Sequence, residues 1–227
     1  MGNHEFNAIC FHKPHVESGG FFRNHSYTEI SQHLETLKQF QHYPNEWETF
    51  LQWFETLPMW FENDDFRVVH AYWDDAYIQF LDQCDKTMSA DFLKKATDKK
   101  TKTKEYLAVE AILKGIEEDL PDGRSFSDKD GNIRKECRVK WWALPENRKT
   151  MNDYLLECPE EIKSHELSDG VKNKFTYTVN KPVLFGHYWL KGIPTVENER
   201  AICLDYSIAK GGKLLAYSID SKKLTYT

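Results

Sequence analysis

The sequence predicts an α/β protein, and the spacing of its apolar residues is the main reason. Apolar residues recur at helical intervals through 27–57 and again through 75–113. The last third instead contains short β-prone runs separated by proline, glycine and asparagine. Hydrophobic residues make up 40% of the 227 positions, enough for one sizeable core. No linker or internal repeat interrupts the chain, so we expect a single domain over 1–227.

The composition excludes several classes of protein. No apolar run approaches the roughly 20 residues that a membrane helix needs, and no secretory signal is expected. A formal charge of −6 without a long basic stripe argues against a nucleic-acid duplex as partner. The five cysteines are widely spaced and form no C-x-x-C pair. We therefore expect neither a disulfide framework nor a thiolate zinc site, and we expect a cytoplasmic protein.

The first half of the chain is predicted to be mainly helical. An amphipathic stretch, Phe6–Phe11, comes first. Ser26 and Glu29 then form a capping-box pattern, and Asn45 with Glu48 repeats it. The helices predicted from these caps and from the apolar spacing cover 27–42, a second segment that ends at Pro58, and then 75–84, 90–96 and 105–113.

Strands are predicted by β-prone runs between turn residues. Phe66–Ala71 follows a polar segment and predicts the first strand. Asp128–Asn132 is a strong turn signal, so 134–144 is expected to return as a hairpin strand with Trp141 and Trp142 on opposite faces. The remaining predicted strands, with a hairpin turn at Gly211–Gly212, are Phe175–Val179, Val183–Phe185, Ala201–Leu204 and Leu214–Ser218.

Two histidines, His70 and His187, stand where the chain leaves a predicted strand. Residues at strand ends can converge on one point although they are distant in sequence. Histidine is a common ligand of divalent transition metals, and the amide oxygen of Asn3 is a neutral ligand as well. Neutral ligands leave net positive charge on a metal, which suits a phosphate substrate. The alternative is that each histidine is a hydrogen-bonded structural residue.

The order of these segments resembles a known family. Gly2-Asn3-His4-Glu5, then His70, then Gly186-His187 follow the order of motifs in the calcineurin-like metallophosphoesterases. That family includes Ser/Thr protein phosphatases and symmetrical bis(5′-nucleosyl)-tetraphosphatases. Leu204–Ser207 followed by Gly212–Leu214 resembles its L-D-T-G…G-K-L tail. The resemblance implies a partial sandwich of two β-sheets flanked by helices, with 75–180 as a helical and hairpin insertion.

The resemblance also implies a reaction and roles for particular residues. Asn3, His70 and His187 would bind one of two metal ions of the Mn, Fe or Zn type. His4 would be the catalytic general acid that protonates the leaving alkoxide, and Glu5 would help to fix its loop. Two cations roughly 3.5–4 Å apart can activate a water for attack on a phosphoester, and an imidazole donates a proton near neutral pH. The implied substrate is a phosphoprotein or a phosphorylated small molecule such as a dinucleoside polyphosphate.

The chain also departs from the family pattern. The family motifs D-x-H and G-D-x-x-D, which supply the first metal's ligands, do not occur here, and only Met1 precedes Gly2. Either the reading frame starts at an internal methionine, or the protein is a shortened, non-catalytic homologue that acts by binding. In both cases at most one metal is expected. A face left exposed by absent strands would allow self-association.

Four further residues are weaker candidates. Arg23 and Arg138 could meet phosphate oxygens through their guanidinium forks, or could be ordinary surface charges. Asp74 could support a metal-binding histidine or cap the helix that follows it. Asp205 could orient a site histidine or simply end a strand. The sequence leaves these alternatives open.

Overall fold

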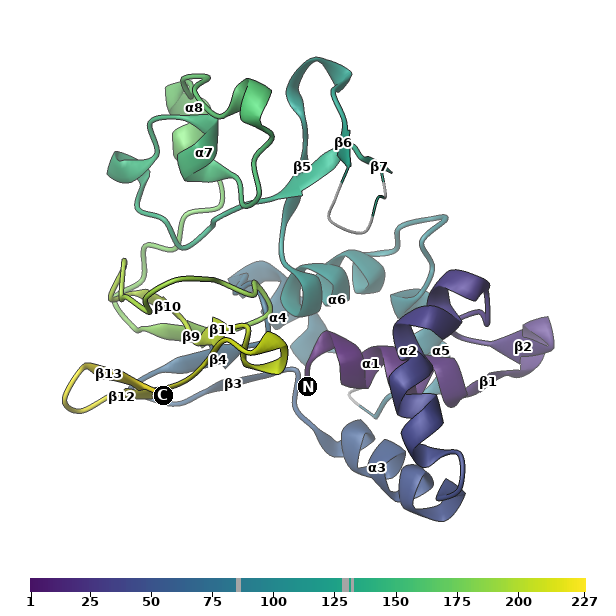
Figure 1. The fold of residues 1–227 in the computed structure, drawn as a ribbon. Coiled ribbons are helices and arrows are strands. Elements are labelled where there is room, and N and C mark those ends of the chain that lie inside the picture. The colour runs from purple at the N-terminus through teal and green to yellow at the C-terminus, as the bar shows by residue number, and fades with distance from the viewer. Residues whose placement is uncertain (85–86, 128–130, 132) are drawn as a thin grey trace. The chain divides into compact units, whose positions relative to one another are not determined.

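The computed structural model describes residues 1–84, 87–127, 131 and 133–227. It is a mixed α/β structure (Figure 1), which confirms the predicted class at that level. The chain divides into two compact units, a first unit of 1–61 with 74–114 and a second unit of 62–73 with 115–227. The segment 75–180, expected as an insertion, contributes to both. Among the described residues, no helix combines the length and apolar character needed to cross a membrane.

The first unit is built mainly from helices. They are α1 (Asn3–His12), α2 (Tyr27–Phe40), α3 (Pro44–Thr56), α4 (Asp75–Asp82), α5 (Ala90–Ala96) and α6 (Lys104–Lys114), with a ribbon of β1 (Pro14–His15) and β2 (Gly20–Phe21). The Ser26 hydroxyl accepts the N–H of Glu29 at 3.4 Å, which confirms the predicted start of α2. Asp74 caps α4, since its carboxylate accepts the N–H of Tyr77 at 2.9 Å.

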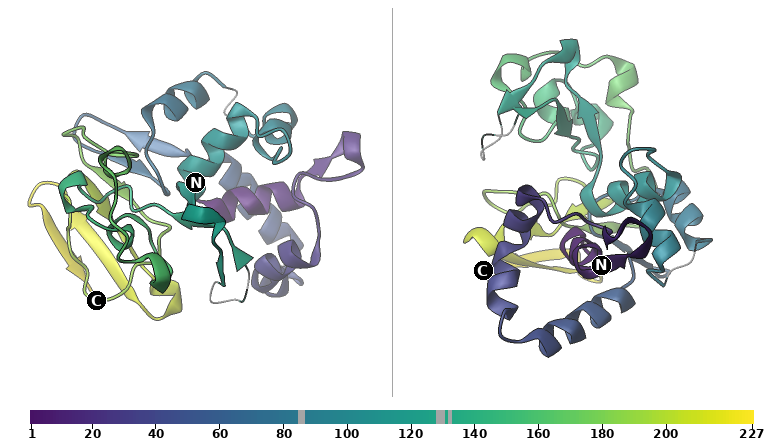
Figure 2. Two further views of the ribbon diagram at one scale, coloured as in Figure 1. Left: turned by 90° about the horizontal axis from the view of Figure 1, so that it is seen from above. Right: turned by 90° about the vertical axis from the view of Figure 1, so that its right-hand side faces the viewer.

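Two predictions about local structure in this unit were wrong or incomplete. Asn45 is not a cap, because α3 already begins at Pro44, and proline suits the first helical position since it has no N–H to leave unpaired. The stretch Phe6–Phe11 lies within α1 and supplies much of the unit's core. The right-hand view of Figure 2 looks along α1, with α2 and α3 on two sides of it.

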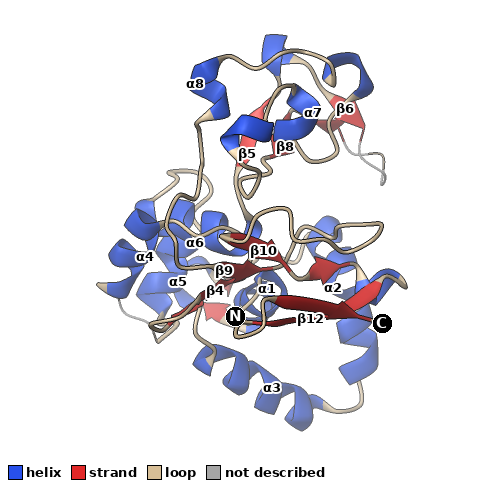
Figure 3. Cartoon of the chain, turned by 90° about the vertical axis from the view of Figure 1, so that its left-hand side faces the viewer, coloured by secondary structure: helices blue, strands red, loops and turns tan. Residues whose placement is uncertain are grey.

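The core of the second unit contains three parallel strands. These are β4 (Arg67–Val69), β9 (Val183–Phe185) and β10 (Ala201–Cys203), and with β3 (Trp60–Glu62) the sheet order is β10-β9-β4-β3. In register, Leu184 lies opposite both Val68 and Ile202. Figure 3 shows β4, β9 and β10 lying side by side. The parallel pairing means that these three strands end at the same edge of the sheet.

The other strands of this unit form smaller antiparallel sheets. β5 (Glu117–Asp119) pairs with β8 (Glu136–Arg138), and β6 (Phe126–Ser127) pairs with β7 (Ile133–Arg134). A three-stranded sheet has the order β11 (Asp205–Tyr206), β12 (Lys213–Ser218), β13 (Lys223–Tyr226), and two short helices are α7 (Met151–Tyr154) and α8 (Asp169–Lys172). The predicted turn at Asp128–Asn132 lies outside the described residues, apart from Gly131.

The return strand predicted over 134–144 is wrong in its second half. Strand β8 ends at Arg138, and Trp141 and Trp142 lie in a turn, both buried rather than on opposite faces of a strand. The cause is the fully buried Arg148, whose guanidinium donates at 3.0 Å to the carbonyls of Lys140 and Trp141. Carbonyls turned toward this cation cannot continue the β8 ladder.

Two other β predictions also fail. Phe175–Val179 forms no strand, and Phe175 has a φ of 49°, in the left-handed region that a strand cannot contain. Gly211–Gly212 is not a two-residue hairpin turn, because a 3-10 turn over Ile208–Lys210 precedes Gly211. Gly212 nevertheless has to be glycine, since a Cβ there would lie 1.9 Å from a backbone carbonyl oxygen.

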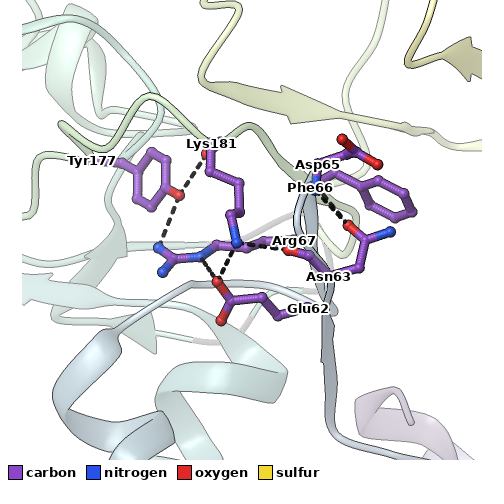
Figure 4. Close-up of polar contacts among 7 residues, drawn as sticks. All are labelled: Glu62, Asn63, Asp65, Phe66, Arg67, Tyr177 and Lys181. Atoms are coloured by element: carbon purple, nitrogen blue, oxygen red, sulfur yellow. Dashed lines mark hydrogen bonds and ion pairs between the residues drawn. The ribbon is translucent and has the colours of Figure 1, made fainter.

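A polar network fixes the beginnings of β4 and β9 (Figure 4). One Glu62 carboxylate oxygen accepts from Arg67 Nε and from Lys181 Nζ, each at 2.9 Å. The Tyr177 hydroxyl accepts from Arg67 at 3.0 Å and donates to the Lys181 carbonyl at 2.7 Å. The hydrogen bond from Lys181, aided by Arg67, holds the pKa of Glu62 below its ordinary value. These contacts tie the segment before β9 to the first residue of β4 and so help to set the register of the site-bearing strands.

Candidate metal-binding site at a sheet edge

The structure brings together three of the predicted site residues. His70, His187 and Asp205 each follow one of the parallel strands, and all three lie at the carboxyl edge of the sheet. The ring centroids of His70 and His187 are 5.2 Å apart. The N–H of Gly186 donates to the His70 carbonyl at 2.9 Å, and a Cβ at Gly186 would lie 3.5 Å from the Asp205 Cβ. Segments more than 100 residues apart thus meet at one point.

Asp205 holds the loop that carries His187. One carboxylate oxygen accepts the N–H of Trp189 at 3.0 Å, and the other accepts the N–H of Ser207 at 3.0 Å. The Asp205 carbonyl accepts the N–H of Leu190, also at 3.0 Å. His187 and Trp189 have φ values of 73° and 53°, a conformation that costs an L-residue on the order of 1–3 kcal/mol. The bonds from Asp205 keep the loop in this strained shape.

Tyr188 anchors the same loop in the core. Its ring is almost fully buried and packs edge-on against Trp142, with centroids 4.6 Å apart. A Cβ on Gly115 would lie 2.3 Å from the Tyr188 hydroxyl, and Gly115 has a φ of 85°. Burial raises the pKa of Tyr188, so its phenol stays neutral. Nothing in the sequence indicates that Gly115 makes room for this ring.

The other predicted residues of the metal site lie in the first unit. Asn3, His4 and Glu5 form the first turn of α1 rather than the expected loop. The Glu5 carboxylate accepts the N–H of Gly2 at 2.9 Å, and the N–H of Phe6 donates to the Gly2 carbonyl at 3.1 Å. Glu5 therefore fixes the local backbone that carries Asn3 and His4.

The weaker candidates have clear structural contacts. The Arg23 guanidinium donates to Gln32 at 2.7 Å and forms an ion pair with Glu29, both on α2. Arg138 lies in β8, and its carbonyl accepts the N–H of Leu156 at 2.8 Å. Asp74 is the cap of α4 described above. Contact of Arg23 or Arg138 with substrate, and support of a metal-binding histidine by Asp74, stay predictions.

The spacing of the two imidazoles fits a shared cation. Two imidazoles that bind one tetrahedral ion at about 2.0–2.1 Å have ring centroids roughly 5 Å apart, since each centroid lies about 1 Å behind its ligating nitrogen. The 5.2 Å between His70 and His187 is of that size. Within the described part of the chain, no three His, Cys, Asp or Glu side chains group to hold a metal, and the expected third ligand, Asn3, is an amide. No family model matches the chain, and no curated protein matches it.

Proposed function

We propose that this chain is an incomplete metal-dependent phosphoester hydrolase of the calcineurin-like type, whose full form acts on a phosphoprotein or a dinucleoside polyphosphate. The observation that carries the proposal is the approach of His70 and His187, with ring centroids 5.2 Å apart, at the carboxyl edge of parallel strands. The ordered motifs that end in these residues, and the Gly2–Glu5 tetrapeptide, support it. In open α/β sheets this edge is where ligands bind.

The same proposal includes a two-layered sandwich architecture and a cytoplasmic location for the protein. The sheet β10-β9-β4-β3 and the sheet β11-β12-β13 would be the two layers of a metallophosphoesterase sandwich. All five cysteines are free thiols, which suits a reducing, cytoplasmic environment.

Each proposed site residue has a distinct task. His70 and His187 would hold one ion of the Mn, Fe or Zn type, and the role of Asn3 as a further ligand stays a prediction from the sequence. An ion bound there would polarise a phosphoryl oxygen as a Lewis acid. His4 would donate a proton to the leaving alkoxide, and an imidazole has a suitable ordinary pKa for that step near neutrality. Asp205 would keep His187 in place through the Trp189 and Ser207 N–H groups.

Metal binding tests the proposed ligands without requiring turnover. The full chain is titrated with Co²⁺ and followed by visible absorption, which reports imidazole ligation. His70→Ala and His187→Ala should each weaken binding at least about tenfold, because each removes a direct ligand. His165→Ala is the matched control, since His165 is an exposed histidine of the same unit. Equal binding by all three variants would contradict the assignment.

Catalysis is tested separately. A segment that carries D-x-H and G-D-x-x-D is joined ahead of Gly2, and release of p-nitrophenol from p-nitrophenyl phosphate is measured with Mn²⁺. We expect the extended chain to hydrolyse the ester and the chain without that segment to show negligible turnover. His4→Ala should lower kcat more than metal content. Metal binding without hydrolysis under any metal would favour the alternative, a non-catalytic homologue that acts by binding.

A further inference from the structure

Two histidines and a tryptophan meet among α1, α2 and α3 of the first unit. His12 Nε2 lies 3.2 Å from His33 Nε2, and the indole N–H of Trp47 donates to His12 Nε2 at 3.1 Å. Their ring centroids are 5.3 Å apart for His12 and His33 and 5.4 Å for His12 and Trp47. One atom, His12 Nε2, is therefore the point at which all three helices are joined by polar contacts.

The chemistry of these groups fixes where the protons are. An indole N–H can only donate, so His12 Nε2 must be an acceptor without a proton. His33 then contributes its own Nε2–H to the same atom. A proton on His12 Nε2 would face the Trp47 N–H and remove that contact, and it would leave the contact with His33 only to the tautomer of His33 whose Nε2 is an acceptor. All three groups can therefore share this contact point, with Trp47 and His33 both donating, only while this atom of His12 is unprotonated.

The surroundings oppose a positive charge at this point. The charged and titratable groups around the two rings are His4, His25, Arg23, Glu48 and the ion pair of Lys13 with Glu55. Burial and His25 lower the pKa of His12, against a smaller opposing effect of Glu48. Burial, His12 and Arg23 lower the pKa of His33 to about 4. The cluster is thus neutral when closed, and an open form would take up protons more readily.

Outside this cluster, helix α2 is held by the ion pair of Arg23 with Glu29 and by ring contacts. Every residue of α2 keeps part of its surface exposed. Its other contacts include the Phe40 ring, 4.9 Å from the Trp47 ring, and the hydrogen bond between Arg23 and Gln32. A cavity of about 740 Å³ lies among the three helices, lined by His12, Trp47 and Phe40 among others. An element with few buried contacts opens at low cost.

We propose that His12, His33 and Trp47 form a proton-operated latch, which fastens α2 to α1 and α3 at neutral pH and releases α2 on mild acidification while the rest of the first unit stays folded. Release would widen the open cavity among the three helices. The latch is independent of the phosphoesterase proposal, since it uses none of the proposed metal ligands.

Hydrogen–deuterium exchange of the full chain tests the latch. Exchange is followed by mass spectrometry at pH 7.5 and pH 5 in EDTA, with correction for the intrinsic pH dependence of amide exchange. If opening is linked to the uptake of one proton, its equilibrium constant rises about tenfold for each pH unit below the ordinary histidine pKa of about 6.5. We therefore expect peptides from α2 to exchange at least about tenfold faster at pH 5, with peptides from α5 and α6 unchanged.

Matched variants identify the atom responsible. His12→Gln keeps an acceptor oxygen near the position of Nε2 and cannot be protonated, so α2 should stay protected at pH 5. His42→Gln, at an exposed histidine between α2 and α3, should behave like the wild type. Acid opening of His12→Gln equal to that of the wild type would overturn the proposal, and so would corrected exchange of α2 in the wild type that is no faster at pH 5 than at pH 7.5.

A second measurement covers the case in which His12→Gln does not fold. Imidazole resonances of the wild type are titrated by NMR alongside the amides of α2. We expect His12 to become protonated together with the loss of α2 protection. Protonation of His12 with α2 still in place would refute the latch. A dependence of α2 protection on added Zn²⁺ would instead identify the pair as a metal site and refute it as well.

Discussion

Replacement of Asp205 is the sharpest mutational test of how the sheet edge is built. Its two carboxylate oxygens accept separate backbone N–H groups, from Trp189 and Ser207, each at 3.0 Å. Asp205→Ala removes both acceptors. Asp205→Asn keeps one oxygen acceptor, but its NH₂ group must face the other N–H. Asp205→Ala therefore removes two hydrogen bonds to the loop, and Asp205→Asn removes one of them.

The size of the effect follows from these contacts. A hydrogen bond to a charged group contributes about 1.5–3 kcal/mol net. Asp205 is only half-buried, so water can replace part of what is lost. We expect Asp205→Ala to lower the free energy of unfolding by about 2–4 kcal/mol and Asp205→Asn by about 1–2 kcal/mol. The left-handed conformations of His187 and Trp189 would relax in part in the alanine variant, while Tyr188 still anchors the loop in the core.

Urea denaturation followed by tryptophan fluorescence gives the free energies of unfolding, and NMR of the His187 ring reports the order of the loop. The prediction is a graded loss, with alanine worse than asparagine and His187 more mobile in both. If both variants stay within 0.5 kcal/mol of the wild type, on the order of an ordinary surface substitution, Asp205 does not hold the loop as described.

Three further predictions concern the second unit, with unfolding free energies measured by urea denaturation. Arg148→Met leaves four carbonyls without the cation that they face and should cost at least about 3 kcal/mol; a neutral result would mean that they rebond easily. Gly115→Ala places a Cβ 2.3 Å from a phenol oxygen and should cost about 2–4 kcal/mol, whereas the control Gly123→Ala, also at positive φ but in open space, should cost about 1–2 kcal/mol. Because the folded pKa of Glu62 lies below its ordinary 4.5, its contribution is present above pH 4.5 and is lost as the pH falls through the folded value. The gap between wild type and Glu62→Gln should close over that interval, and a gap independent of pH would contradict this.

Elements specified by neighbouring residues could be predicted from the sequence. The start of α2 at Ser26 and the whole of α5 were predicted correctly, because a cap and a local apolar repeat are sufficient to specify them. Trp141 and Trp142 were predicted wrongly, because their turn depends on carbonyl contacts with Arg148, which the local pattern does not reveal. Phe175 was placed in a strand because its neighbours are β-prone, and its left-handed backbone has no local signal.

The site was predictable to the extent that it depends on strand polarity. His70 and His187 each follow a β-prone run, so parallel pairing of those runs was enough to bring them together. The pairing of His12 with His33 could not be predicted, since they lie on different helices and meet only after those helices pack. A sequence reveals paired histidines when they stand three or four residues apart on one helix, and these two do not.

The central claim is that His70 and His187 share one metal ion, and a zinc-soaked crystal tests it most directly. Anomalous diffraction at the zinc edge locates the ion independently of the protein atoms. We predict one peak within about 2.1 Å of a ring nitrogen of each histidine. A peak elsewhere, with both rings engaged only by hydrogen bonds, would contradict the claim.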